Sequence, residues 1–187
     1  RATAMAPAAA DPLMALVRLE LAQNQIERVR RRLENIVTAQ PSHSYAHGML
    51  AEVWAILGRP DVAAAQYREA TRLNPAWVTP WLNWASLLQI QQPDAAIRIL
   101  KEGIAANASS EELHMLLASV LANQGLIDEA IESYESVLRI NPRNLLAANN
   151  LAILLADHKQ DPTYLERAFL LSRDFEKEAP HPLFIDT

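Results

Sequence analysis

The chain has 187 residues, half of them apolar, and a formal net charge of −5. Alanine and leucine outweigh valine, isoleucine and threonine, and apolar and polar residues never alternate over a long run, so helices are favoured over sheets. The small negative charge argues against a nucleic-acid partner, and the absence of cysteine excludes disulfides and thiolate catalysis. No run of about 18 apolar residues is present, so we predict no membrane insertion for this chain.

The first part of the chain divides into a tail and a helical segment. Residues 1–9 are small, include Pro7 and show no periodicity, which predicts a disordered tail. In residues 10–43, apolar residues recur at helical spacing before and after Asn24, and the pattern stops at Pro41. Asparagine tolerates the left-handed conformation that ends many helices, so we predict two helices joined at Asn24.

A run of arginines lies within this segment, in the sequence ERVRRR at residues 27–32. It could form an anion-binding or nucleic-acid-binding patch, or the solvated outer face of a helix. Glu27 and Glu34 flank the arginines at distances that allow pairing along a helix. The solvated face is therefore the favoured interpretation.

Residues 44–77 and 78–110 repeat the two-helix pattern. In the first of them Gly58 marks the turn, and Pro60 with Asp61 suits the start of the second helix. The next segment is one residue shorter in its turn, and Ala108 stands where the others have proline.

Three tryptophans cluster where these two segments meet: Trp77, Trp81 and Trp84. They could stack on a ligand or pack between helices. We favour packing for Trp81 and Trp84, which fall at apolar positions of the helical pattern, whereas Trp77 lies in the connection and has no evident partner.

Residues 111–144 give the clearest copy, with Gly125 at the turn and Pro142 at the end. Ser109 precedes Glu112 by three residues, a spacing typical of a capping box. The last segment, residues 145–182, carries an insertion of about four residues near KQDPTY and ends after Pro180. We expect residues 183–187 to begin a sixth copy that the chain cuts short.

The recurring segment is about 34 residues long and resembles the tetratricopeptide repeat, whose pattern is W-x2-L-G-x2-Y, then A-x3-F, then P. In residues 111–144, His114 stands at the tryptophan position, Ala118 at the glycine position, and Ala130, Tyr134 and Pro142 follow in phase. Five copies in phase over residues 10–182 imply an all-α, right-handed solenoid of antiparallel helix pairs.

The resemblance also implies a concave groove lined by the first helix of each repeat, which family members use to bind peptides or proteins. The residues at groove positions on which we place the partner site are Arg18, Tyr45, Met49, Glu52, Asn83, Ser86, Gln89, Met115, Ser119, Asn123, Asn149 and Asn150. With one basic residue among them, a clamp for a C-terminal carboxylate is disfavoured. Asn83 and Asn150 share the sixth repeat position, which resembles an asparagine ladder for an extended peptide, although Met49 and Leu116 interrupt it.

Enzymatic signals are weak. The candidate catalytic or metal-binding residues are the five histidines, His43, His47, His114, His158 and His181. We interpret His47 and His114 as packing residues because both occupy the repeat position at which the family packs an aromatic residue. His158 lies beside Asp157 and Asp161, but neighbours on one short loop rarely converge on a metal. The four glycines do not cluster into a phosphate loop.

We therefore predict a non-catalytic scaffold that binds a protein or an extended peptide, with no cofactor and no metal. The alternatives are a self-assembly module that forms homodimers, and an accessory domain of a larger enzyme such as a glycosyltransferase. The late sequence NNLAILLAD, followed by LERA, AP and IDT, also resembles the late repeats of bacterial tetratricopeptide proteins of the cell envelope, including lipoproteins linked to exopolysaccharide and protein-sorting systems. This resemblance favours the periplasm or cell envelope over the cytoplasm.

Overall fold

The computed structural model describes residues 12–159 and 161–178. The predicted tail and the predicted start of a sixth repeat lie outside the described residues. The described residues contain no strand and form ten helices of 11 to 17 residues, as the all-α prediction requires. These are α1 (Pro12–Ala22), α2 (Ile26–Ala39), α3 (Ser44–Ile56), α4 (Pro60–Leu73), α5 (Val78–Leu88), α6 (Pro93–Ala106), α7 (Glu111–Asn123), α8 (Ile127–Ile140), α9 (Leu145–His158) and α10 (Pro162–Glu178).

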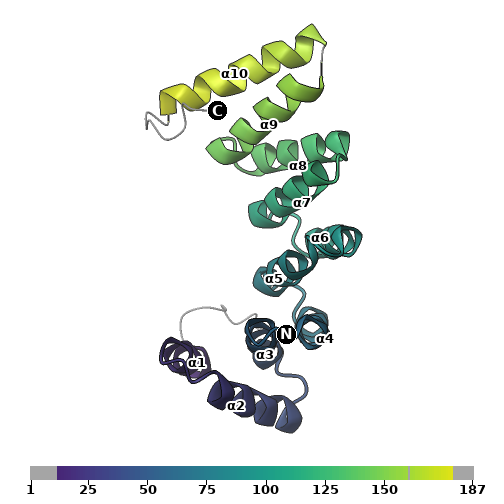
Figure 1. The fold of residues 1–187 in the computed structure, drawn as a ribbon. Coiled ribbons are helices and arrows are strands. Elements are labelled where there is room, and N and C mark those ends of the chain that lie inside the picture. Colours follow the sequence, from purple (N-terminus) through teal and green to yellow (C-terminus); the bar gives the residue numbers. More distant parts are fainter. Residues whose placement is uncertain (1–11, 160, 179–187) are drawn as a thin grey trace, which may run out of the picture. The chain divides into compact units, whose positions relative to one another are not determined.

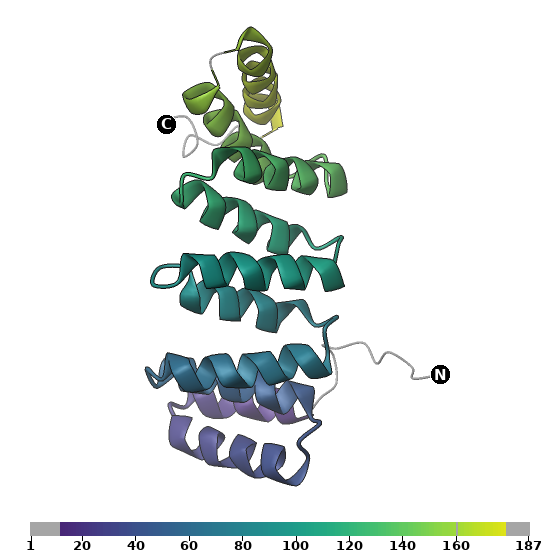
Figure 2. The same cartoon turned by 90° about the vertical axis from the view of Figure 1, so that its right-hand side faces the viewer.

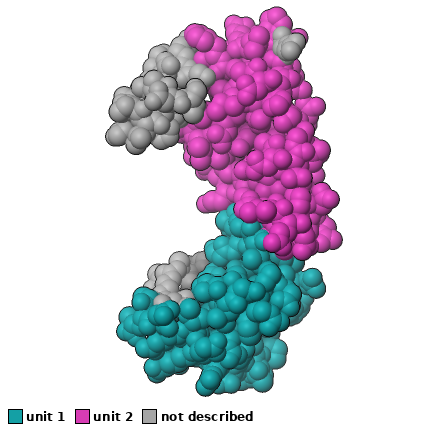
Figure 3. All heavy atoms as spheres, viewed as in Figure 1, with its two compact units in different colours: residues 1–87 teal, residues 88–187 magenta. Residues whose placement is uncertain are grey.

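The helices belong to two compact units, residues 1–87 and residues 88–187 (Figure 3). In the first unit α1 packs on α2, α2 on α3, and α3 on α4. In the second unit each helix from α6 to α10 packs on the next along the chain. Helices that follow one another within a unit run in opposite directions (Figures 1 and 2). The boundary between the units falls inside the predicted repeat 78–110. The units therefore do not mark the ends of the repeats, and the repeat boundaries remain a prediction.

The turns within the hairpins adopt the conformation that their residues predict. Asn24, Gly58 and Gly125 have φ values of 58°, 70° and 72°. This left-handed region costs glycine little and asparagine less than most residues, so each helix can end there sharply. Prolines begin α4, α6 and α10, where the missing amide proton would have had no helical partner.

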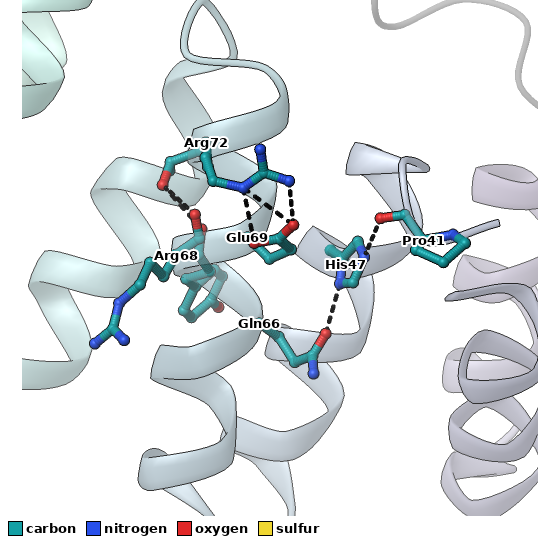
Figure 4. Close-up of polar contacts among 8 residues, drawn as sticks. Pro41, His47, Gln66, Arg68, Glu69 and Arg72 are labelled. Atoms are coloured by element: carbon teal, nitrogen blue, oxygen red, sulfur yellow. Dashed lines mark hydrogen bonds and ion pairs between the residues drawn. The ribbon is translucent and has the colours of Figure 1, made fainter. Parts of the chain in front are cut away.

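A ring nitrogen at a repeated position bonds to the turn that precedes each of three helices. His47, Trp81 and His114 each place a ring nitrogen near the backbone carbonyl oxygen six residues earlier, at 3.0, 3.0 and 3.3 Å. Figure 4 shows this contact for His47 and the carbonyl group of Pro41. The shared contact explains why one position holds both tryptophan and histidine: each offers a donor on a flat ring.

Each unit has its own apolar core. In the first unit, Val29 and Leu33 of α2 pack with Leu50 and Val53 of α3, and all four are at most 2% exposed. In the second unit the core residues come from α7, α8, α9 and α10: Ala118, Ile131, Tyr134, Val137, Ala147, Leu151, Ala152, Leu155 and Ala168. Stacking of neighbouring helices therefore buries these nine residues, each at most 7% exposed.

The tryptophans pack between helices, as predicted for two of them. Trp81 and Trp84 are each 7% exposed, and their rings stack with centroids 6.5 Å apart. Trp77, which had no predicted partner, lies against Tyr45 at 4.6 Å between centroids. A side chain at Gly48 would meet the Trp77 ring at 2.5 Å, so this glycine makes room for the indole on α3.

Two local predictions are wrong in detail. The cap of α7 is Ser110, not Ser109: its hydroxyl oxygen accepts the amide of Leu113 at 3.3 Å and its proton goes to Glu112 at 2.8 Å. The insertion before α10 is mostly helical rather than a longer loop. Because Pro162 suits a first helical turn, residues 162–164 lengthen α10 at its N-terminus.

Candidate peptide-binding surface

The first helix of each hairpin carries the residues that we predicted to line a groove. In the first unit Tyr45 and Glu52 are half-buried on α3. On α5, Asn83 is half-buried and Ser86 is exposed. Met49 departs from the prediction: it is only 5% exposed and belongs to the apolar core. The reason is that its long apolar side chain packs in the same cluster as Leu33.

Two of these residues contact each other. The side-chain amide of Asn83 donates a hydrogen bond to Glu52 Oε1 at 3.0 Å, which links α5 to α3. Burial raises the pKa of Tyr67 on α4, the Glu52 carboxylate raises it further, and a hydrogen bond from Asn83 acts in the opposite direction. Asn83 therefore bridges a carboxylate and a phenol inside the unit, which is the structural role that competes with peptide binding.

In the second unit the predicted partner-site residues on α7 and α9 carry no charge. Ser119, Asn149 and Asn150 are half-buried and Asn123 is exposed at the end of α7. Met115 is half-buried and packs on the core of this unit. Asn150 donates to the phenol oxygen of Tyr134 at 3.3 Å, and burial raises the pKa of that tyrosine while this bond opposes the shift.

One predicted groove residue, Gln89, lies outside the first helices. Gln89 follows the last residue of α5 and lies in a turn, because α5 is three residues shorter than α9. The side chain of Arg18 lies outside the described residues.

The asparagines belong to a rule that connects neighbouring hairpins. The residue at the sixth position of a repeat can be paired with the residue 16 positions earlier, which lies on the second helix of the preceding repeat. Where the earlier residue is tyrosine, the later one is asparagine; where it is leucine, the later one is methionine or leucine. The four pairs are Leu33 with Met49, Tyr67 with Asn83, Leu100 with Leu116, and Tyr134 with Asn150.

The amides retain part of their hydrogen-bonding capacity. A primary amide offers two donors and an acceptor oxygen. Asn150 uses one donor, which leaves one N–H and its oxygen without a partner among the described residues. Asn83 interacts with both Glu52 and Tyr67, so it retains less of this capacity than Asn150 does. Asn150 can thus still pair with both the N–H and the C=O of an extended backbone.

The arginine run is mostly neutralised. Arg30 pairs with Glu27 and Glu34 at 2.8 and 2.7 Å. Arg28 and Arg32 pair with Glu20, at 3.3 and 2.9 Å, and the carboxylate of Glu20 is 5% exposed. Three of the four arginines therefore have acidic partners, which supports the solvated-face interpretation over an anion site.

The histidines occupy structural positions where they are described. His43 caps α3 by accepting the amide of Ala46 at 3.2 Å, and His47 and His114 make the carbonyl contacts given above. His158 is exposed at the end of α9, and His181 lies outside the described residues. Within residues 12–159 and 161–178, no three histidine, aspartate or glutamate side chains gather as metal ligands, and no helix is long and apolar enough to cross a membrane.

Antiparallel helix pairs stacked in sequence within each unit, three of them joined at a residue with a left-handed φ, define a helical repeat protein. A family model described as "Tetratricopeptide repeat" matches residues 14–76 and 86–144, more than half of the chain. The chain belongs to the tetratricopeptide repeat family. The comparison with curated proteins finds no match.

Solved structures share the fold at low sequence identity. A MamA protein is 19% identical with a TM-score of 0.68, over 89% of this chain and 93% of that one. YrrB, described as a tetratricopeptide protein with an unusual peptide-binding site, is 20% identical with a TM-score of 0.66, over 92% and 89%. PilF of Pseudomonas aeruginosa is 23% identical with a TM-score of 0.67, over 88% and 72%.

Proposed function

We propose that this chain is a non-catalytic scaffold that binds a protein or an extended peptide through the first helices of its hairpins. Family membership supports a protein-interaction scaffold, and the similarity to YrrB, a protein with a peptide-binding site, is consistent with a peptide as the partner. The observation that carries the proposal is the uncommitted amide chemistry on α9, where Asn150 keeps one donor and one acceptor and Asn149 lies beside it.

The proposed contact is with peptide backbone rather than with charged side chains. The polar residues of the proposed partner site on α7 and α9 are serine and asparagine, which form neutral hydrogen bonds. A bond of this kind contributes about 0.5–1.5 kcal/mol net, so two from Asn150 would change affinity by roughly 5- to 150-fold.

The test starts from peptides captured on an array of random decamers. Asn150→Ala removes both proposed contacts and the bond to Tyr134, whereas Tyr134→Phe removes only the internal bond. We expect the two variants to melt at similar temperatures and only Asn150→Ala to weaken peptide binding. Equal affinity of Asn150→Ala and the unmodified chain would reject α9 as the binding surface.

A second candidate function, self-assembly, is favoured by a row of exposed apolar residues on α10. Leu165, Phe169 and Leu170 are 44%, 66% and 41% exposed. Residues four apart lie on one helix face, so Leu165 and Phe169 form a continuous apolar strip.

Sedimentation equilibrium over a range of concentrations tests this second candidate. A homodimer built on α10 should dissociate on Phe169→Glu and persist on Ile56→Glu, which changes an equally apolar residue, 59% exposed, on α3. A monomer at all concentrations would exclude self-assembly of this chain.

A further inference from the structure

The second unit contains a cavity of about 260 Å³ that opens between α6, α7 and α8. Its apolar part is formed by Ile104 of α6 with Leu117 and Leu121 of α7. The volume lies below the range of about 300–1,000 Å³ typical of sites for whole small molecules, so it suits one side chain. The α7 residues that line it differ from Ser119 and Asn123 of the proposed partner surface.

The cavity exists because one side chain is short. In the first unit, His47 Nδ1 lies 2.7 Å from the side-chain oxygen Oε1 of Gln66, so the glutamine reaches the edge of the imidazole (Figure 4). Ser133 is the counterpart of Gln66 two repeats further along the chain. It follows His114 by 19 residues, as Gln66 follows His47. The serine hydroxyl bonds to the Glu129 carbonyl at 2.9 Å instead, so it does not reach the histidine ring.

The polar atoms around the cavity are almost all acceptors. A carbonyl only accepts, so the contact of His114 Nε2 with the Ala108 oxygen places a ring proton on Nε2 and leaves Nδ1 of the neutral ring as an acceptor. The hydroxyl groups of Ser133 and Ser136 donate their protons to backbone carbonyl oxygens of α8. Their oxygen lone pairs remain available to accept a hydrogen bond from a ligand. No partner of His114 Nδ1 occurs among the described residues.

Two carboxylates and one ammonium group complete the lining. Lys101 of α6 donates to Glu129 at 2.8 Å, so that pair is internally neutralised. Glu132 is exposed, lines the cavity and forms no ion pair within the described part of the chain. The cavity therefore combines an apolar floor, several acceptors and one uncompensated negative charge.

We propose that this cavity binds an arginine side chain of a partner protein. A guanidinium group carries five N–H donors in a plane and no acceptor, which complements a site whose free groups are acceptors. The arginine stem would lie on Ile104, Leu117 and Leu121, and the guanidinium would bond to Glu132 and His114 Nδ1. Lysine is the poorer fit because its compact, strongly hydrated ammonium has three donors and no flat face.

The probe for this site is Nα-acetylarginine amide, titrated into the full chain and followed by two-dimensional ¹H–¹⁵N NMR. Nα-acetylcitrulline amide is the matched control, since it keeps the shape and loses the charge. We expect shifts confined to residues around the cavity, with a Kd on the order of millimolar for the isolated residue. The citrulline compound should bind at least about tenfold more weakly, because a hydrogen bond to a charged group is the stronger kind.

Variants separate the two features of the site. Ser133→Gln introduces the residue that fills the equivalent space beside His47, and it should abolish binding. Glu132→Gln should weaken it about five- to tenfold. Glu102→Gln removes a similarly exposed carboxylate of α6 that does not line the cavity, and it should change nothing.

Three results would overturn the proposal. The first is a set of shifts that maps outside α6, α7 and α8, or no shifts at all. The second is equal binding of the arginine and citrulline compounds. The third is unchanged binding in a folded Ser133→Gln variant; if that variant unfolds, equal affinity of Glu132→Gln and Glu102→Gln decides against the site.

Discussion

The side chain of Asn150 donates a hydrogen bond to the phenol oxygen of Tyr134, which lies 16 residues earlier on the preceding helix. Asn83 stands in the same relation to Tyr67 in the first unit. These bonds connect the second helix of one hairpin to the first helix of the next. They turn a surface residue that the repeat pattern assigns to a groove into a residue that also holds two hairpins together.

A double-mutant cycle measures the energy of this connection. Tyr134→Phe and Asn150→Leu should each lower the free energy of unfolding by about 1 kcal/mol, because the first leaves a half-buried amide and the second a buried phenol without its partner. The double variant should lose less than the sum, with a coupling of about 0.5–1 kcal/mol, since both halves of the bond are then gone. Urea unfolding gives the values, and strict additivity would mean that the bond contributes nothing.

Gly48→Ala should destabilise the first unit. The added methyl group would lie 2.5 Å from the Trp77 ring, so the indole or the helix has to move. Overpacking of this kind costs about 1–3 kcal/mol. In a Trp77→Ala background the same change should cost almost nothing, or even stabilise α3, because alanine is the better helix former. Thermal unfolding of the four proteins checks both expectations.

Arg32→Met should also destabilise the first unit. The Glu20 carboxylate is 5% exposed and bonds to Arg32 at 2.9 Å, so the change leaves a buried charge with Arg28 alone. Hydrogen bonds to charged groups contribute about 1.5–3 kcal/mol, and the loss should lie in that range. Arg31→Met, an exposed neighbour, is the control and should change the unfolding free energy by less than about 0.5 kcal/mol.

Stability should fall as the pH rises above about 10. Burial raises the pKa of Tyr67 in the folded chain above the value near 10 of an unfolded tyrosine. A raised pKa contributes stability that is fully present below the unfolded value and is lost as pH rises toward the folded value, because the unfolded state releases its proton first.

Denaturant unfolding at several pH values between 9 and 11.5 tests the sign. Tyr67→Phe should flatten the decline, because it removes the proton that couples folding to pH. Tyr164→Phe, which changes a tyrosine that is 39% exposed, is the comparison. A decline that is as steep in Tyr67→Phe as in the unmodified chain would contradict the expected coupling.

The sequence predicted the helices well because local signals determine them. Asn24, Gly58 and Gly125 mark the turns by their backbone conformation, and prolines mark helix starts. These effects depend on a residue and its immediate neighbours along the chain. Ser110 shows the limit of such signals: two adjacent serines both fit a cap, and only the actual start of α7 distinguishes them.

The candidate site was harder to predict because it depends on residues from different helices. The resemblance to the repeat family assigned Met49 to a groove, but the structure buries it in a cluster with Leu33 of the preceding helix. The cavity beside His114 was missed altogether, since it results from a side chain that is shorter than its counterpart Gln66. Aligning the repeats and looking for a buried position where one repeat has a much smaller side chain than another could have found it.

The pairing of residues 16 apart has a consequence for how such a chain can change its length. Polar and apolar pairs alternate along the sequence, so removal of residues 44–77 would bring Leu33 opposite Asn83 and leave the amide beside an apolar side chain. Removal of residues 44–110 would bring Leu33 opposite Leu116, a matched pair. Insertions and deletions in multiples of two repeats are therefore compatible with this chain, whereas those of one repeat impose an unsatisfied polar group on the new junction.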